Sequence, residues 1–511
     1  MSSCINDCKR EHQIEVEPLQ DDDQVEHSLL LIKGRLQPSC ASAKQLKATL
    51  TLRQQEQEQL TQLTAAGEFK LLFDLSEPHG DTAAACELQL CCCNAERRLR
   101  FSYQPRRSAY RVQPLLLLCH NTNDEEQRQT ESESAEEQCA VIDLNLRLVQ
   151  CIYAHKLSAA GFRNRTFTLN AACCVFRSQL SCATARASGE DELWQRFASE
   201  ILSSPDWGQQ LHLKFVAFIG CTRYDGGGVV ASGDYSYANI RRHLQAHAAL
   251  GGGGLALFGT GHFYAWPRHF AQIGDCIRSS RRVDVARQPD DSNYRRSYGG
   301  VYASTLGAVC HELGHCFDLG HTQEGVMGHG FDYLNRVLTV DQLTEHLPQR
   351  IVASPSATAN ATASASASST SRPRFTQLKL KQPAGNKYLD NYHSQRRNDS
   401  FYFSRNCAVI LAQHRWLRPD LNKAEQLSAH IQLLPASSEI VSNVPLRLIE
   451  LRCNLNSLVA HYEEFAAQPA TLRFRLPDAL WHLLATQRTH YAFVLTVEGD
   501  TKRLACDPVQ A

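Results

Sequence analysis

The order of apolar and polar residues predicts β-strands at the start of the chain. From residue 27 to residue 103, short apolar runs alternate with turn-forming stretches. Short runs of this kind are typical of strands, because successive side chains of a strand point to opposite faces. We expect strands at 28–36, 46–53, 68–75, 87–93 and 98–103. Five strands so closely spaced predict a small β-sandwich domain over residues 1–105.

The pattern changes near residue 106, where apolar runs begin to alternate with helical periods. Continuous apolar runs predict buried strands at 112–120, 211–221 and 254–266, with a shorter strand at 166–169. Helical patterns occupy 139–157, 191–202 and 298–317. Strands that alternate with helices predict an α/β domain with a mostly parallel sheet, here over residues 106–350. The acidic stretch 121–138 is interpreted as a solvated loop.

The last third of the chain has a different composition. Residues 353–374 are almost entirely Ala, Ser and Thr with a few other residues, which is typical of a low-complexity linker or inserted loop. Residues 375–511 combine a helical segment at 406–417 with several strand-like runs, so we expect a mixed or β-rich C-terminal module. The predicted fold class is therefore a multidomain α+β and α/β protein.

Charge and composition narrow the choice of partner and compartment. The chain has 53 basic and 53 acidic residues, so nothing in its net charge favours nucleic acid or an anionic membrane. No apolar stretch is long enough for a membrane span, and the first residues do not resemble a secretory signal. We expect a cytoplasmic or nuclear protein that is not secreted. Its 20 cysteines are then expected to be free thiols, mostly small core hydrophobes in runs such as 91–93.

One segment carries candidate metal chemistry, HELGHCFDLGH at 311–321. His311 and His315 stand four residues apart, which places both imidazoles on one face of a helix, as a tetrahedral zinc ion requires. Glu312 lies next to the first histidine, where it can reach a water molecule bound to the metal and act as a general base. Zinc lowers the pKa of such a water to about 7.

The third candidate ligand is His321, six residues beyond His315. A continuing helix would carry it about 9 Å along the axis, so the helix must end and the chain must turn back. Asp318 or Gly320 can make that bend, because Asp and Gly tolerate a positive φ. Three histidine ligands leave a fourth position open, which is typical of a catalytic zinc. Met327, the second of two methionines, follows between glycines.

This segment resembles the metzincin clan of zinc endopeptidases, with Asp318 at the position of the clan's glycine. The wider stretches around it are similar to a little-described eukaryotic family of intracellular metallopeptidases, Metallopep. The resemblance implies one zinc per chain on His311, His315 and His321, Glu312 as base, and Met327 as the methionine-turn residue beneath the metal.

The resemblance also implies how a peptide or protein substrate is held. Clan members line the cleft with an antiparallel edge strand, and we expect that strand just before the active-site helix. The predicted edge residues are Gly254, Leu255, Ala256, Leu257, Phe258 and Gly259. His329, two residues after Met327, is a weak candidate for a position near the metal, and a polar turn residue is the simpler interpretation.

Three function classes remain open from the sequence. The first is a zinc metalloendopeptidase, favoured by the intact Glu312. The second is a catalytically weak or inactive zinc-binding scaffold, in which the terminal modules bind partners. The third is a zinc hydrolase of non-peptide amides. An edge strand that can pair with a peptide backbone would separate the first class from the third.

Overall fold

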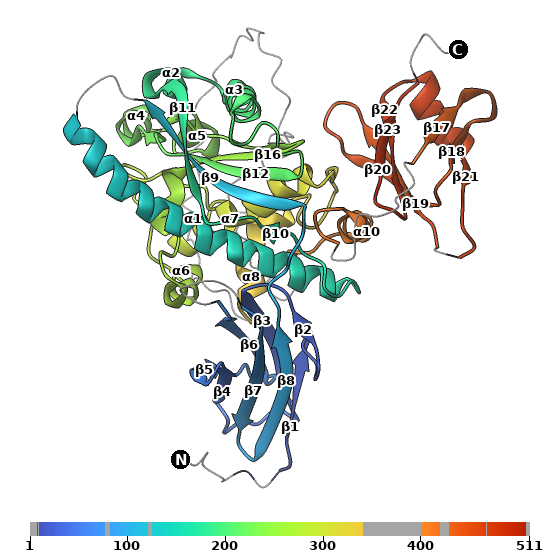
Figure 1. Cartoon of the computed structure of the whole chain (residues 1–511). Coiled ribbons are helices and arrows are strands. Elements are labelled where there is room, and N and C mark those ends of the chain that lie inside the picture. The colour runs from blue at the N-terminus through green and yellow to red at the C-terminus, as the bar shows by residue number, and fades with distance from the viewer. Residues whose placement is uncertain are drawn as a thin grey trace, which may run out of the picture.

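The computed structural model describes residues 8, 10–76, 82–120, 125–340, 400–418, 429–466 and 468–506, with the backbone alone for 125–133. Three parts follow one another along the chain: a β-rich part below, a central mixed part, and a second β-rich part to one side (Figure 1). The predicted linker at 353–374 lies outside the described residues. No helix among the described residues is long and apolar enough to cross a bilayer.

The N-terminal part is built from two sheets that face each other. One sheet has the order β1 (Gln13–Glu17), β3 (Leu29–Gln37), β6 (Glu68–Asp74). The other has the order β2 (Gln24–Val25), β8 (Ala95–Tyr103), β7 (Ala84–Cys92), β4 (Gln45–Leu52), β5 (Gln55–Gln62). Alternate residues of β4 are buried, and the inner faces share one hydrophobic cluster. The five predicted strands and the sandwich arrangement are therefore confirmed.

Sequence patterns missed β1, β2 and β5. The sequence of β5 is QEQEQLTQ, which has almost no apolar face to reveal its period. It pairs with β4 over its whole length, so main-chain hydrogen bonds to a buried neighbour define it. The separate hydrophobic cluster of this part supports the domain boundary near residue 105, which stays a prediction.

The central sheet has the order β10 (Thr168–Leu169), β9 (Arg111–His120), β12 (Leu213–Ile219), β16 (Leu255–Gly259), β15 (Ala249–Gly252), with β11 (Cys174–Ser181) also paired to β9. The strands are parallel except β15, which runs antiparallel to β16. The prediction of a mostly parallel sheet is confirmed.

The predicted substrate edge strand is corrected by this topology. Residues 255–259 form β16, which hydrogen-bonds to β12 on one side and to β15 on the other. Both edges of β16 are therefore occupied within the sheet, and residues 260–265 form a 3-10 helix instead of a continued strand. All five residues of β16 are buried, because helices pack on both faces of the sheet at this strand. The antiparallel outer strand is β15, one element earlier in the chain.

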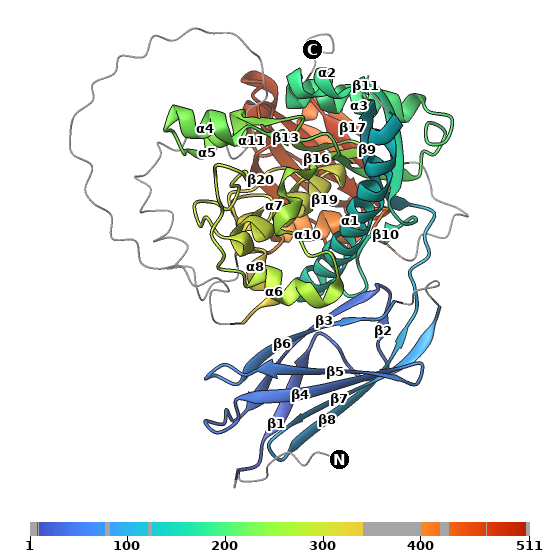
Figure 2. The ribbon, with the colours of Figure 1, turned by 90° about the vertical axis from the view of Figure 1, so that its left-hand side faces the viewer.

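Helices cover both faces of the central sheet. The long α1 (Glu125–Ala159) and α7 (Tyr298–Cys316) share a cluster with one face, through residues such as Val216 and Phe258 (Figures 1 and 2). Helix α3 (Glu190–Ser203) packs on the opposite face with Ala217 and Leu257. The alternation of these strand residues between two faces explains their continuous apolar runs.

The acidic stretch expected to be a loop is corrected in part. Residues 121–124 lie outside the described residues, and α1 begins at Glu125, so 125–138 are helical. The stretch is rich in Glu and Gln, which propagate a helix at little cost. The segment after residue 139 packs into the central cluster, and because helix formation is cooperative the polar residues before it continue the helix.

The C-terminal part contains two further sheets around their own hydrophobic cluster. Their strand orders are β17 (Ile431–Leu434), β18 (Glu439–Ser442), β21 (Arg473–Arg475), and β20 (Val459–Glu464), β19 (Leu446–Cys453), β22 (His490–Thr496), β23 (Thr501–Leu504). Helix α10 (Arg405–Gln413), predicted within this module, packs into the central cluster instead. The module boundary at residue 375 lies outside the described residues and stays a prediction.

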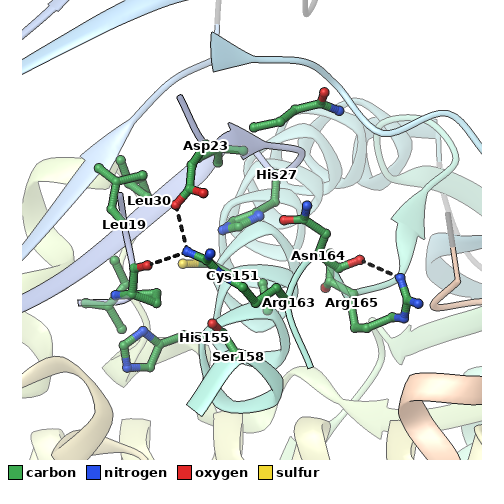
Figure 3. Close-up of a pocket in the computed structure, with 16 residues that line it drawn as sticks. Leu19, Asp23, His27, Leu30, Cys151, His155, Ser158, Arg163, Asn164 and Arg165 are labelled. Carbon is green, nitrogen blue, oxygen red and sulfur yellow. Dashed lines mark hydrogen bonds and ion pairs between the residues drawn. The ribbon is translucent and has the colours of Figure 1, made fainter. Parts of the chain in front are cut away.

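Polar contacts join the sandwich to the central part. Lys70 Nζ on β6 donates to the main-chain oxygens of Arg336 (2.6 Å) and Thr339 (2.9 Å). A pocket lies between the sandwich and α1, lined by His27, Cys151 and His155 among others (Figure 3). At its rim Arg163 binds Asp23 at 2.9 Å. None of the residues that line this pocket belongs to the HELGH segment.

Candidate metal centre

Helix α7 carries the first two candidate ligands and is buried along almost its whole length. Ser297 caps its N-terminus by accepting a hydrogen bond from the Gly300 N–H at 3.1 Å. Near the other end, a Cβ on Gly314 would lie 2.7 Å from Met327 Sδ. Glycine at 314 therefore lets the methionine pack directly against the helix.

His311 and His315 project from one face of α7, as the four-residue spacing predicts. Their Nε2 atoms are 3.2 Å apart. Burial lowers the pKa of His315 to about 3, with further lowering from the neighbouring His321. The imidazole is therefore neutral at neutral pH, which is the form that binds a metal.

The helix ends in a reversal at Asp318, whose φ is +64°. The Leu319 N–H donates to the Gly314 oxygen (3.0 Å), and the Asp318 N–H donates to the His315 oxygen (3.1 Å). These two bonds form a Schellman motif with aspartate in the left-handed position where glycine is usual. Asp318 is thus the bend residue, and Gly320 does not have a positive φ.

The reversal brings His321 to the other two histidines. Its Nε2 atom lies 3.1 Å from His315 Nε2. The ring nitrogens of His311, His315 and His321 all lie within 4.8 Å of one another. Zinc–nitrogen bonds near 2.0–2.1 Å in a tetrahedral shell place two ligand nitrogens about 3.3 Å apart. The donor set therefore fits one zinc ion.

Each imidazole is oriented by a main-chain carbonyl at its far nitrogen. The Nδ1 atoms of His311, His315 and His321 donate to the oxygens of Val326 (2.7 Å), Leu319 (2.9 Å) and Asn456 (2.5 Å), respectively. A proton on Nδ1 leaves the lone pair on Nε2, the atom that faces the other histidines. Such outer hydrogen bonds fix the tautomer and the ring orientation of metal-binding histidines.

Glu312 is buried beside the three histidines but is not a member of their cluster. Its Oε2 accepts a hydrogen bond from the Gly251 N–H of β15 at 2.8 Å. A Cβ on Gly251 would lie only 2.0 Å from the Glu312 main-chain oxygen, so this glycine allows β15 to touch α7. The carboxylate is consequently held in place by the outer strand of the sheet.

Met327 and His329 occupy different environments. Met327 is 1% exposed, and its main-chain oxygen accepts from the Thr322 N–H at 3.1 Å, which closes a turn under α7. This position agrees with a methionine turn, a role that stays a prediction. His329 is exposed at the start of a 3-10 helix (Gly330–Tyr333) and does not join the histidine cluster. A polar turn residue is the better description of it.

The C-terminal part completes the site, which sequence patterns did not indicate. The Asn456 carbonyl belongs to this part, and two further main-chain hydrogen bonds join it to His321. The His321 N–H donates to the main-chain oxygen of Ser457 (3.1 Å), and the Val459 N–H donates to the main-chain oxygen of His321 (2.9 Å). Arg452 Nη2 donates to the main-chain oxygen of Asp318 at 2.8 Å. These contacts join residues more than 130 positions apart, so no local signal in the sequence could reveal them.

The Asp318 side chain is engaged on the far side of the turn. Its Oδ2 accepts from Thr501 Oγ1 at 3.0 Å and lies 3.7 Å from His414 Nε2. Burial alone would raise the pKa of Asp318, but the hydrogen bond and charge of His414 hold that pKa at about 2. Asp318 is therefore a carboxylate that braces the turn and is not a member of the histidine cluster.

Three comparisons with known proteins bear on this arrangement. A 97-residue stretch is 36% identical to "Putative zinc metalloproteinase YIL108W" of Saccharomyces cerevisiae, covering 18% of this chain and 14% of that protein. A 187-residue stretch is 26% identical to "Putative zinc metalloproteinase C607.06c" of Schizosaccharomyces pombe, covering 36% of this chain and 27% of that protein. The chain thus spans only a small part of either relative's length.

A solved structure of a protein from Bacteroides thetaiotaomicron covers 18% of this chain and 86% of its own, at 13% identity and a TM-score of 0.14. That likeness is too slight to inform the fold. The family model of Metallopep, described as "Putative peptidase family", matches residues 13–415, from β1 through α10. The match covers most of the chain and confirms the resemblance to Metallopep that the wider stretches around the HELGH segment indicated. The chain belongs to this peptidase family.

Proposed function

We propose that the protein is a zinc metallopeptidase that binds one Zn²⁺ on His311, His315 and His321. The observation that carries the proposal is the convergence of three Nε2 atoms whose rings are each oriented by a carbonyl. Three protein ligands leave a fourth position for water or substrate, as in catalytic zinc sites. The histidine-only donor set also suits zinc better than the oxygen-preferring Mg²⁺ or Ca²⁺.

Glu312 is the proposed general base. When bound, the ion would lower the pKa of a coordinated water molecule and polarise the substrate carbonyl. Glu312 takes a proton from the attacking water and delivers it to the leaving amine. This role requires a carboxylate that lies beside the metal ligands but is not itself a ligand. The Gly251 N–H provides the restraint that keeps the carboxylate there.

We propose that an extended peptide substrate aligns with β15 (Ala249–Gly252). This strand pairs with β16 alone among the described strands, so no other described strand covers its outer edge. Its Gly251 N–H is bound to Glu312, and a peptide would pair with other main-chain groups of that edge. Its Gly251 contacts Glu312 directly, so a peptide along that edge would pass beside the proposed base. This assignment replaces the interior strand 254–259 that the sequence suggested.

The deciding experiment combines zinc analysis with peptide-library cleavage. Wild-type protein should contain zinc at the triad and cleave peptides, and His321→Ala should lose most of that zinc and all detectable cleavage. Glu312→Gln should retain the triad zinc yet fail to cleave. Cleavage that survives in both variants would contradict the proposal.

Two alternative functions make different predictions in the same experiment. An inactive zinc-binding scaffold would retain zinc but cleave no peptide, with Glu312→Gln indistinguishable from wild type. A hydrolase of non-peptide amides would depend on Glu312 but ignore peptides of every sequence. The contact between Glu312 and an outer antiparallel strand favours the peptidase. None of the described cysteines forms a disulfide, and a cytoplasmic or nuclear location is proposed from the sequence.

A further inference from the structure

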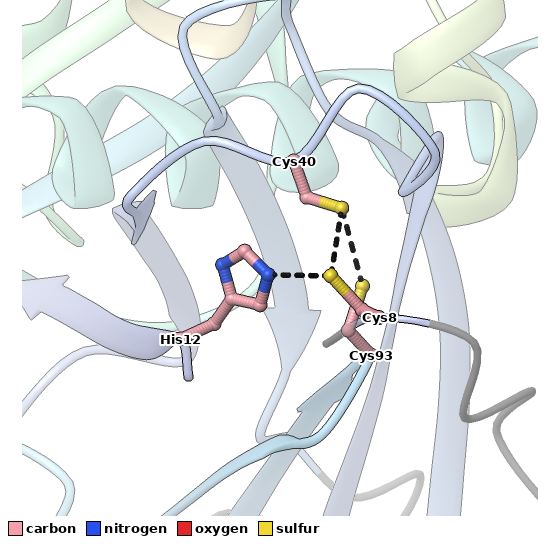
Figure 4. A group of neighbouring side chains, drawn as sticks. All are labelled: Cys8, His12, Cys40 and Cys93. Carbon is pink, nitrogen blue, oxygen red and sulfur yellow. Dashed lines mark hydrogen bonds between the residues drawn. The ribbon is translucent and has the colours of Figure 1, made fainter. Parts of the chain in front are cut away.

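We propose that the N-terminal sandwich binds a second, structural zinc ion on Cys8, His12, Cys40 and Cys93. These four side chains converge at one end of the sandwich, far along the chain from the HELGH segment (Figure 4). Each offers one ligand atom, and the four atoms lie within 4.8 Å of one another. Three cysteines and one histidine are a known structural zinc set.

The sulfur–sulfur distances suit a tetrahedral ion better than a disulfide. The Cys8 Sγ atom lies 2.9 Å from His12 Nε2 and 3.5 Å from Cys40 Sγ. The Cys40 and Cys93 sulfurs are 3.8 Å apart. With zinc–sulfur bonds near 2.3 Å, two thiolates of a tetrahedral site stand about 3.8 Å apart, whereas a disulfide needs about 2.05 Å. A disulfide would also use two sulfurs and leave the third sulfur and the imidazole unexplained.

His12 is prepared for metal binding in the same way as the three histidines of α7. It is 7% exposed, and its Nδ1 lies 2.7 Å from the main-chain oxygen of Pro38. A proton on Nδ1 donates to that carbonyl and leaves the Nε2 lone pair directed at the sulfur of Cys8. Pro38 and Cys40 belong to the same loop after β3, so one short segment supplies both a ligand and the group that orients another.

The backbone at Cys93 gives an independent indication. Cys93 and Asn94 form the two-residue turn between β7 and β8, and Cys93 has a φ of +53°. This left-handed conformation favours Gly, Asn or Asp and is strained for a cysteine. The turn presents the Cys93 sulfur to the cluster, and Asn94 Nδ2 donates to the Arg10 oxygen at 2.9 Å. The strained residue therefore has a ligand role that explains it.

The site would fasten three separate segments together. Cys8 and His12 precede β1, Cys40 follows β3, and Cys93 lies in the β7–β8 turn. Four protein ligands leave no open position, so the ion would be structural and not catalytic. Binding would release three thiol protons, since cysteine ligates zinc as the thiolate. Cys93 is therefore a proposed ligand, in contrast to the core role expected for the 91–93 run, a role that Cys92 does fill.

The test uses the full-length protein, purified with a reductant and without chelator. Metal analysis should find two zinc ions in the wild type. A His311→Ala/His315→Ala double variant should retain one, and so should Cys93→Ser, which keeps the triad. Cys91→Ser is the matched control, because Cys91 is the neighbouring thiol outside the cluster, and it should retain two.

Cobalt substitution in the triad double variant gives a readout that needs no cysteine variant to fold. Co²⁺ on thiolates produces an intense near-ultraviolet charge-transfer band, which a histidine-only site lacks. That band should appear in the double variant and disappear when Cys8→Ser is added. The proposal is overturned if the double variant binds neither zinc nor thiolate-ligated cobalt. It is equally overturned if peptide mass mapping of the purified protein, alkylated without a further reduction step, shows Cys8 disulfide-bonded to Cys40. Because the triad is absent in this variant, failure of the peptidase proposal would not affect the result.

Discussion

His321 Nδ1 lies 2.5 Å from the main-chain oxygen of Asn456, a residue 135 positions later in the chain. The third candidate ligand is therefore oriented by a turn of the C-terminal part, which lies beyond the residues that match the family model. The same turn exchanges main-chain hydrogen bonds with His321. The C-terminal part thus contributes contacts to the candidate metal centre.

Loosening this turn should weaken zinc binding at the triad. Asn456 Oδ1 accepts from the Leu458 N–H at 3.1 Å, which stabilises the turn that aims the carbonyl at His321. We expect Asn456→Ala to reduce triad zinc affinity roughly 10-fold, the lower end for outer-shell partners of a metal ligand. Competition with a fluorescent chelator measures the affinity. Asn454→Ala is the control, because Asn454 Nδ2 contacts Arg488 and not His321. Equal affinities for both variants would contradict the expectation.

The bend at Asp318 should tolerate glycine and reject a β-branched residue. With φ at +64°, Asp318→Gly keeps the reversal without strain but loses the contacts to Thr501 and His414. Asp318→Val loses the same contacts and also strains the backbone, since β-branched residues rarely adopt a positive φ. We expect Gly to retain triad zinc and Val to lose most of it. Zinc content of the two purified variants decides the matter, and a zinc-loaded Val variant would refute the argument.

Removing the Glu312 carboxylate should separate catalysis from metal binding. Glu312→Gln preserves the size of the side chain, and its amide oxygen can still accept the hydrogen bond from the Gly251 N–H. The amide cannot, however, take the proton of an attacking water. We expect peptide cleavage to fall roughly 10²–10⁴-fold with unchanged zinc content and melting temperature. Steady-state cleavage assays and metal analysis on the same preparation test this. Loss of triad zinc would instead identify Glu312 as a ligand.

A methyl group on Gly251 should impair catalysis through the strand–helix contact. An added Cβ would meet the Glu312 main-chain oxygen at 2.0 Å, which forces β15 away from α7. We expect Gly251→Ala to lower kcat at least 10-fold while the triad keeps its zinc, because the carboxylate loses its restraint. Gly252→Ala is the control, since a Cβ there meets nothing within 4 Å. If the two alanine variants cleave equally well, β15 does not position the base.

Acid should weaken the junction between the sandwich and α1. Burial, followed by the charge of Lys156, lowers the pKa of His155 from 6.5 to about 3, and the side chain is 8% exposed. Between pH 6.5 and about pH 3, His155 is therefore protonated in the unfolded chain but neutral in the folded chain. This contribution to stability is complete above pH 6.5 and is lost as the pH falls toward 3.

The matching variant is His155→Leu, which removes the titrating group. Its free energy of unfolding should fall less steeply than that of wild type between pH 7 and pH 5, by at most about 1.4 kcal/mol per pH unit. Urea unfolding at several pH values gives both slopes. Parallel slopes would mean that His155 is protonated in the folded protein.

Local sequence patterns predicted those features that local physics determines. The helix period predicted His311 and His315 on one face. The tolerance of Asp and Gly for a positive φ limited the bend to Asp318 or Gly320, and the structure has it at Asp318. Alternating apolar residues in the sequence predicted strands such as β4. They did not predict β5, because its sequence is almost entirely polar and shows no apolar period. The sequence predicted a loop at the acidic start of α1, because polarity alone does not distinguish a solvated helix from a loop.

Features that depend on distant residues could not be predicted in this way. Sheet order decides that β16 is interior and β15 is the outer strand, and no period within either strand encodes that order. The Cys8–His12 pair has a plausible metal spacing, but only the fold brings Cys40 and Cys93 to it. The carbonyl of Asn456 has no side-chain signature at all.

The contact between His321 and the 456–459 turn has a thermodynamic consequence. If that turn favours zinc binding by some factor, zinc must favour docking of the C-terminal part by the same factor, because coupled equilibria are reciprocal. Zinc binding at the triad would then depend on docking of the C-terminal part, and that docking would depend equally on zinc binding. A chelator that removes zinc from the proposed site would then loosen the docking of the C-terminal part without contacting it, and a ligand of the C-terminal part would change the affinity of the proposed site for zinc.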